Sequence, residues 1–149
     1  MTTRNPLLRE FMLTRFVSVE PTMDIDHATR LILSNALMGA PVVERGALVG
    51  VLSEKDVFRV LANRVFELDN DNGGTVADFM TRDVVTLDAD LDLATVASMF
   101  LSHVYRGLPV VEGQRLVGLV SRRDILRALV ELRQTPRFQK YPDYRRPQD

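Results

Sequence analysis

Two short stretches of the sequence place a hydroxyl and a carboxylate at the same spacing. Ser53 is followed three positions later by Asp56, and Ser121 by Asp124. An apolar run precedes each serine, so each stretch is predicted to be a corner where a strand enters a helix, with Ser-x-x-Asp as its capping box. We expect such a corner to offer backbone N–H donors at the positive end of a helix dipole, which suits an anion. Basic residues lie in both corners, namely Lys55 in the first and Arg122 and Arg123 in the second.

These residue types meet two needs of a nucleoside phosphate. Phosphate oxygens accept hydrogen bonds from N–H groups at a helix start, from a hydroxyl and from a cation. A ribose diol needs an ionised acceptor for its two hydroxyl protons, a role open to Asp56 and Asp124. If the chain is a ligand sensor, replacing either aspartate by alanine is expected to abolish ligand binding and to leave the fold near-native. The alternative is a capping box that only closes the helix, because that motif forms whether or not a ligand binds.

The two corners belong to an internal repeat. A shift of 68 positions aligns Phe11–Leu61 with Phe79–Leu129 without a gap, and 18 of the 51 aligned pairs are identical. The identical pairs include glycines and prolines, such as Gly39 with Gly107. A gapless match of this length indicates a duplication, which constrains the fold before any local pattern is considered.

Each copy is predicted to fold in the order helix, strand, helix, β-hairpin, helix. Apolar residues recur at three- and four-residue spacing in the central helix, as an amphipathic helix requires. A Pro-Val-Val run, a tight turn and a Leu-Val-Gly run are typical of a hairpin. The fold class is therefore α+β, a two-layer arrangement of helices and sheet. The predicted details are leading helices after Pro6 and Thr75, extended segments at Phe16–Val19 and Val84–Leu87, N-caps at Thr22 and Asp90, and helix C′ residues at Gly39 and Gly107.

The sequence divides into four parts. The first copy is placed at residues 5–62 and the second at 75–132, with a turn-rich linker at 63–74 between them. Residues 133–149 form a basic tail that contains three prolines. Composition alone favours a flexible tail, and its interleaved aromatic residues leave contact with a partner subunit as the alternative.

The composition argues against several classes of function. A net charge of -1 gives no whole-molecule reason to bind nucleic acid or an acidic membrane surface. The chain has no cysteine, so it has no disulfide, thiolate nucleophile or cysteine-bound metal. No apolar run approaches the ~18 residues of a membrane span, and the first residues do not resemble a signal peptide, so a cytoplasmic location is expected. We interpret His27 and His103 as surface residues, and Asp88, Asp90 and Asp92 as helix-start charges with a chance metal site as the alternative.

The repeat resembles a pair of CBS domains, the module named after cystathionine β-synthase. The matching residues are the Gly-x-Pro-Val-Val hairpins that begin at Gly39 and Gly107, together with the two Gly-x-x-Ser-x-x-Asp corners. The resemblance covers about residues 8–132. It implies that the two copies pack their sheets together with pseudo-two-fold symmetry, as a tandem (Bateman) module with two clefts between the copies. It also implies adenosine ligands in those clefts and a homodimer of two modules.

By this resemblance, each cleft takes a phosphate- and ribose-binding corner from one copy and an apolar base slot from the other. One cleft is expected to combine Ser18, Met38 and Gly39 with Ser121, Arg122, Arg123 and Asp124. The second is expected to combine Thr86, Tyr105, Arg106 and Gly107 with Ser53, Lys55 and Asp56. The ring of Tyr105 could stack on the base or block the slot.

Two hypotheses about function follow. The first is a regulatory sensor that binds AMP, ADP, ATP or S-adenosylmethionine and thereby changes what an unidentified protein partner contacts. This mechanism needs no catalytic group, metal or resident cofactor, and the sequence indicates neither a cysteine nucleophile nor metal-ligand spacing, so the chain is not expected to be an enzyme. The alternative is a ligand-free scaffold that dimerises and binds proteins. Hydrolysis of a bound nucleotide, or a metal at the three neighbouring aspartates, would instead indicate an enzyme.

Overall fold

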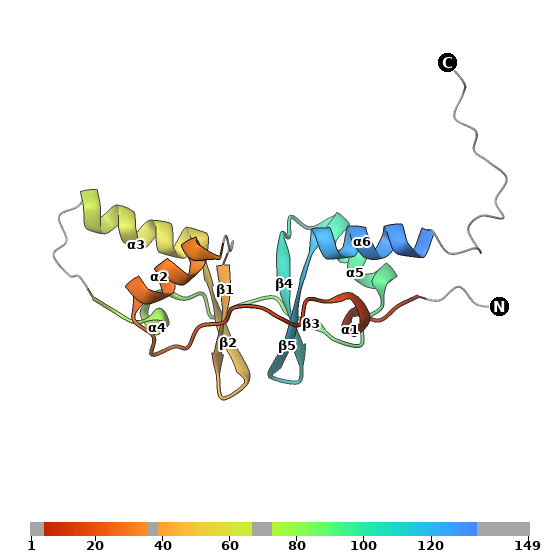
Figure 1. Cartoon of the computed structure of the whole chain (residues 1–149), viewed down its shortest axis with the longest axis horizontal. Helices are drawn as coiled ribbons and strands as arrows, with labels where there is room; N and C mark the ends of the chain where they lie inside the picture. Colours follow the sequence, from red (N-terminus) through yellow and green to blue (C-terminus); the bar gives the residue numbers. More distant parts are fainter. Residues whose placement is uncertain (1–4, 36–38, 67–72, 134–149) are drawn as a thin grey trace, which may run out of the picture.

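A computed structural model describes residues 5–35, 39–66 and 73–133 of the chain (Figure 1). Both copies show the predicted mixture of helices and a hairpin, which confirms the α+β fold class. The first copy contains α1 (Leu8–Phe11), α2 (Ile25–Ser34), β1 (Gly39–Glu44), β2 (Ala47–Ser53) and α3 (Glu54–Phe66). The second contains α4 (Val76–Phe79), β3 (Leu87–Asp88), α5 (Leu93–Ser102), β4 (Gly107–Glu112), β5 (Arg115–Ser121) and α6 (Arg122–Arg133).

The two hairpins stand side by side in the middle of the molecule, and the helices flank them on the outside (Figure 1). The sheet order is β1-β2-β5-β4-β3. One residue pair, Ala47 with Arg115, joins the two hairpins into this sheet. Two backbone hydrogen bonds flank it, from Leu48 N–H to the carbonyl oxygen of Gln114 at 2.9 Å and from Leu116 N–H to that of Gly46 at 3.1 Å. The sheet therefore has a narrow junction at its centre.

Each half has its own hydrophobic core, and the leading helices exchange between the halves. Leu8 of α1 is fully buried in the core of the second half, with the side chains of β4, β5, α5 and α6. Val76 of α4 is fully buried in the core of the first half. Backbone hydrogen bonds fix both helices, from Leu8 N–H to Leu91 at 2.7 Å and from Val76 N–H to Met23 at 2.9 Å. The repeats in the sequence are thus not the units that pack, as the positions of α1 and α4 in Figure 1 show.

The segment after each leading helix crosses a hairpin at a glycine. Leu13 pairs with Leu119, and Thr81 pairs with Val51, each through two backbone hydrogen bonds of 2.8–2.9 Å. A β-carbon on Gly50 would lie 2.7 Å from the carbonyl oxygen of Thr81, and one on Gly118 would lie 2.5 Å from the sulfur of Met12. The identical glycines of the repeat therefore allow the exchanged segments to approach the sheet closely.

The central helices begin and end differently from the prediction. Their N-caps are Asp24 and Asp92, not Thr22 and Asp90. The Asp92 carboxylate accepts a hydrogen bond from the backbone N–H of Thr95 at 2.8 Å, and this bond lowers the pKa of Asp92. Asp90 instead binds Arg9 of the exchanged helix α1, with 2.7 Å between Nη2 and Oδ1.

The predicted glycine caps at the other end of these helices are also wrong. Helices α2 and α5 end at Ser34 and Ser102, and Gly39 and Gly107 are the first residues of β1 and β4. The chain leaves α5 with His103 in an extended conformation, so this helix needs no left-handed glycine.

The extended segments are shorter than predicted. In the second copy only Leu87 and Asp88 form a strand, parallel to β4, and in the first copy Val19 forms a single parallel bridge with Val42. Helix α3 continues to Phe66, four residues beyond the limit of 62 that the sequence suggested for the first copy.

Candidate functional site

The second corner forms the predicted capping box where β5 enters α6. One carboxylate oxygen of Asp124, Oδ2, accepts hydrogen bonds from the backbone N–H of Ser121 at 2.8 Å and from its hydroxyl at 2.9 Å. The hydroxyl of Ser121 in turn accepts from the backbone N–H of Asp124 at 3.3 Å. The other carboxylate oxygen, Oδ1, lies 3.5 Å from the guanidinium of Arg127. The capping box therefore uses only Oδ2 of Asp124, and Oδ1 accepts no hydrogen bond within the box.

The backbone donors of this corner are largely satisfied within the protein. The N–H groups of Ser121 and Asp124 belong to the capping box, and the N–H of Arg122 donates to the carbonyl oxygen of Arg106 at 3.2 Å. These three donors are not left for an anion, contrary to the expectation from the sequence. An anion at this corner would therefore be bound mainly by side-chain cations.

The first corner has a similar cap but a more enclosed carboxylate. Asp56 accepts from the backbone N–H of Ser53 at 2.9 Å and also from the hydroxyl of Thr81 at 3.2 Å. The residue Asp56 is 7% exposed, whereas the Asp124 side chain is 16% exposed. Asp56 thus holds a structural hydrogen-bond network together, and its removal is not expected to leave the fold near-native.

The exchanged segments cause this difference between the corners. Thr81, which follows α4, forms the bridge to Val51 that brings its hydroxyl to Asp56. Leu13 forms the equivalent bridge to Leu119 in the other half, and a leucine side chain has no donor for Asp124. The contact between Thr81 and Asp56 was not predicted from the sequence. The repeat has Leu13 at the position equivalent to Thr81, and this change from an apolar to a hydroxyl side chain could have indicated it.

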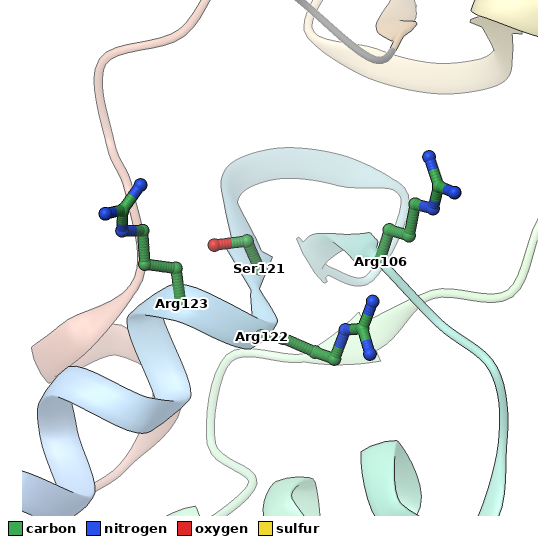
Figure 2. A pocket seen from close by; sticks show the side chains of 4 residues that line it. All are labelled: Arg106, Ser121, Arg122 and Arg123. Atoms are coloured by element: carbon green, nitrogen blue, oxygen red, sulfur yellow. The ribbon is translucent and has the colours of Figure 1, made fainter.

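A shallow, open cleft of about 450 Å³ lies beside the second corner, and three of its four lining residues are arginines. Arg106, Ser121, Arg122 and Arg123 line it. In Figure 2, the hydroxyl of Ser121 lies between Arg123 on one side and Arg106 and Arg122 on the other. All three arginines are exposed, and within the described residues none of their guanidinium groups forms a hydrogen bond or an ion pair.

The cleft corrects one grouping that the sequence suggested. Arg106 was predicted to join Ser53, Lys55 and Asp56 of the first copy, but it lines the cleft at Ser121 within its own copy. The reason is the hairpin register, in which Gly107 at the start of β4 pairs with Ser121 at the end of β5. Residues next to these two positions must therefore lie together.

Other predicted site residues occupy different environments. The ring of Tyr105 stacks on His103 with 5.1 Å between ring centroids, and it meets the edge of Phe100 at 5.7 Å. This ring packs against the second core, and His103 already occupies one of its faces. The remaining predicted residues differ in exposure. Four of them are exposed, namely Ser18, Lys55, Thr86 and Gly107, and two are half-buried, namely Gly39 and Ser53. Met38 lies outside the described residues.

The neighbouring aspartates of the second copy have structural partners. Asp90 binds Arg9, Asp92 caps α5, and Asp88 accepts a hydrogen bond from the backbone N–H of Asp90 at 2.8 Å. In the part of the chain that the structure describes, no group of three or more acidic, histidine or cysteine side chains is arranged to hold a metal ion. Within that same part, every helix is too short or too polar to cross a membrane.

Comparison with solved structures finds tandem CBS domains with the same arrangement. The CBS-pair protein CBSX2 from Arabidopsis thaliana, in a crystal structure of its complex with AMP, has a TM-score of 0.73 and 27% sequence identity, over 86% of this chain and 98% of that one. The CBS domain pair of protein MJ0100, in complex with 5′-methylthioadenosine and S-adenosyl-L-methionine, has a TM-score of 0.68 and 25% identity, over 86% of this chain and 98% of that one.

Sequence comparison leads to the same family. The protein MJ1225 of Methanocaldococcus jannaschii is 31% identical over 126 residues, which are 84% of this chain and 43% of MJ1225. This chain thus spans less than half the length of that relative. The profile of the CBS domain matches twice, at residues 8–63 and 76–131. The two matches fall on the two copies of the repeat, and this chain therefore belongs to the CBS domain family as a tandem pair.

Proposed function

We propose that this chain is a regulatory module that binds an adenosine-containing ligand, either AMP, ADP, ATP or S-adenosylmethionine, beside its second corner. The observation that carries the proposal is the open cleft beside Asp124 that is lined by Ser121 and three arginines, whose guanidinium groups have no partner among the described residues. The complexes of CBSX2 with AMP and of MJ0100 with S-adenosyl-L-methionine support an adenosine ligand. We assign no reaction to the module, because binding alone is sufficient for this role.

Each residue of the second corner has a separate part in the proposed complex. The guanidinium groups of Arg122 and Arg123 bind phosphate oxygens through charge-assisted hydrogen bonds. The Oδ1 of Asp124, which lies outside the capping box, accepts hydrogen bonds from the ribose hydroxyls after Arg127 moves aside. We place the base against the first half of the molecule, near Ser18, so that the ligand contacts both halves.

A ligand in contact with both halves can change how they are oriented. The hairpins meet through one residue pair, so the junction between them is small. A ligand shifts such an equilibrium only by the difference between its affinities for the two arrangements. We propose that the favoured arrangement alters the surface that a partner protein, still to be identified, contacts.

Thermal melting tests whether an adenosine ligand binds. At 100 times its Kd, a ligand that binds only the folded chain adds about 2.7 kcal/mol to the free energy of unfolding. We expect a rise of several degrees in Tm for at least one of AMP, ADP, ATP and S-adenosylmethionine. Cytidine and uridine monophosphates serve as controls for non-specific anion effects. If no adenosine compound raises Tm at millimolar concentration, the proposed function is wrong.

A second candidate function, a scaffold that works by self-association, is favoured by the exposed apolar side chains of the outer helices. Phe58 of α3 is 73% exposed and its repeat equivalent Leu126 of α6 is 62% exposed. Leu33 and Leu101, which are also related by the repeat, are exposed on α2 and α5. Equivalent apolar positions on both halves suit an isologous contact with a second copy, so we propose a homodimer through these helices.

Light scattering coupled to gel filtration tests this assembly. The wild-type chain is expected to elute as a dimer, and the double variant Phe58→Glu, Leu126→Glu as a monomer, because four buried carboxylates per dimer would be left without partners. Asn63→Glu, an exposed site on the same helix α3, is the matched control and should stay dimeric. A dimer that survives the double substitution would exclude this interface. A dimer that binds no adenosine compound would leave the scaffold as the function.

A further inference from the structure

We propose that the cleft at the second corner is specific for nucleoside di- and triphosphates, and that the equivalent corner of the first copy is not a second polyphosphate site. The inference rests on the proposed function, since it concerns the ligand of the same cleft. It adds that Arg106, Arg122 and Arg123 are specificity-determining residues which favour ADP and ATP over AMP and over S-adenosylmethionine.

The three arginines of the cleft carry more positive charge than a monophosphate carries negative charge. A phosphate monoester carries a charge of about −1.5 to −2 at pH 7. The side chains of Arg106, Arg122 and Arg123 line the cleft together with Ser121, and across residues 5–35, 39–66 and 73–133 no carboxylate pairs with any of the three guanidinium groups. Each guanidinium presents several N–H donors in a planar fork that suits phosphate oxygens. A chain of two or three phosphates supplies both the charge and the number of acceptors that this set of donors can use.

The three arginines approach the cleft from two elements held in a fixed relation. Arg106 immediately precedes β4, and Arg122 and Arg123 lie in the first turn of α6. The hydrogen bond of 3.2 Å from Arg122 N–H to the Arg106 carbonyl oxygen ties these two backbones together. The side chains spread to different sides of Ser121 (Figure 2), so they can contact successive phosphates of an extended chain.

The first corner lacks this charge, although the repeat supplies the equivalent positions. Arg106, Arg122 and Arg123 correspond to Met38, Glu54 and Lys55. Three positive charges in the second copy are thus matched by one negative and one positive charge in the first. The carboxylate of Asp56 is also occupied by the Thr81 hydroxyl. The asymmetry indicates that, of the two corners, only the second is a polyphosphate site.

The same charge distinguishes the candidate ligands. S-adenosylmethionine carries a sulfonium, an ammonium and a carboxylate group, so its net charge is positive and a cluster of three arginines disfavours it relative to an anionic nucleotide. AMP uses only part of the available donors. Inorganic tripolyphosphate shares the phosphate chemistry of ATP but offers neither a ribose for Asp124 nor a base, so it separates binding of the phosphate chain from binding of the nucleoside.

Isothermal titration of the full chain tests the proposal with ATP, ADP, AMP, S-adenosylmethionine and inorganic tripolyphosphate. We expect ATP to bind at one site per chain, with an affinity at least about 10-fold higher than that of AMP. The variants Arg106→Gln and Arg122→Gln should each weaken ATP binding by about 10-fold and AMP binding by much less. Lys55→Gln, at the equivalent corner of the first copy, is the matched control and should bind ATP like the wild type. All of these side chains are exposed, and equal Tm values without ligand confirm that the variants fold.

The outcomes separate this inference from the function on which it rests. Equal affinities for AMP and ATP, or equal losses for both in the arginine variants, would overturn the polyphosphate specificity while adenosine binding stands. Loss of ATP binding in Lys55→Gln would overturn the assignment to the second corner. Tripolyphosphate binding as tightly as ATP, and lost in Arg122→Gln, would support the arginine site but contradict the proposed adenosine function. If neither ATP nor tripolyphosphate binds, the polyphosphate site is wrong.

Discussion

Replacing Leu8 by alanine is expected to lower the free energy of unfolding by about 2–5 kcal/mol, the usual cost of truncating a fully buried leucine. Leu8 belongs to α1, at the beginning of the chain, but its side chain is buried in the core of the second half. Its truncation would leave a cavity among side chains of β4, β5, α5 and α6. The measurement is urea unfolding of the full chain, followed by circular dichroism and analysed by linear extrapolation.

A nearby leucine provides the control for this experiment. Leu13 lies five residues further along the same exchanged segment and is 47% exposed. Leu13→Ala keeps its backbone pairing with Leu119 and is expected to cost much less than Leu8→Ala. If Leu8→Ala costs less than about 1 kcal/mol, α1 does not dock in the second half and the exchange described above is wrong.

The exchange is the part of the fold that sequence patterns could not provide. Hairpins, amphipathic helices and capping boxes follow from local rules of spacing and turn chemistry, and the repeat doubled each of these signals. The choice between two docking sites for a leading helix is not local. Each leading helix ends in a phenylalanine that a methionine follows, Phe11 and Met12 for α1 and Phe79 and Met80 for α4, so these residue types do not distinguish the two docking sites.

The candidate site was predicted in part, for a related reason. The corners at Ser53 and Ser121 were found because a capping box is a local motif. The grouping of Arg106 with the wrong corner came from the resemblance, whereas the hairpin register places it beside Ser121. The burial of Asp56 depends on Thr81, which reaches it only because α4 docks in the first half. Knowledge of the exchange is therefore needed before the two corners can be told apart.

Replacing the two corner aspartates by alanine is expected to affect different properties, ligand binding for Asp124 and stability for Asp56. Asp124→Ala should weaken nucleotide binding by about 10- to 100-fold, because it removes the charged acceptor for the ribose hydroxyls. Asp56→Ala should leave nucleotide binding intact and lower the free energy of unfolding by about 1–3 kcal/mol. The reason is that the half-buried N–H of Ser53 and the hydroxyl of Thr81 would both lose the acceptor that the buried Asp56 provides.

Both variants lose a capping interaction of about 1 kcal/mol, so the comparison between them cancels this common effect. The measurements are the Kd for ATP by titration calorimetry and the unfolding midpoint in urea without ligand. The variant Thr81→Val isolates the structural part, since it removes one hydrogen bond of Asp56 and leaves Asp124 unchanged. Should Asp56→Ala abolish ATP binding while its stability matches that of Asp124→Ala, the first corner would be the binding site. The assignment of ligand recognition to the second corner would then be wrong. Asp56 was excluded as a ligand residue because it is buried and accepts a hydrogen bond from Thr81, and this result would show that neither feature prevents binding.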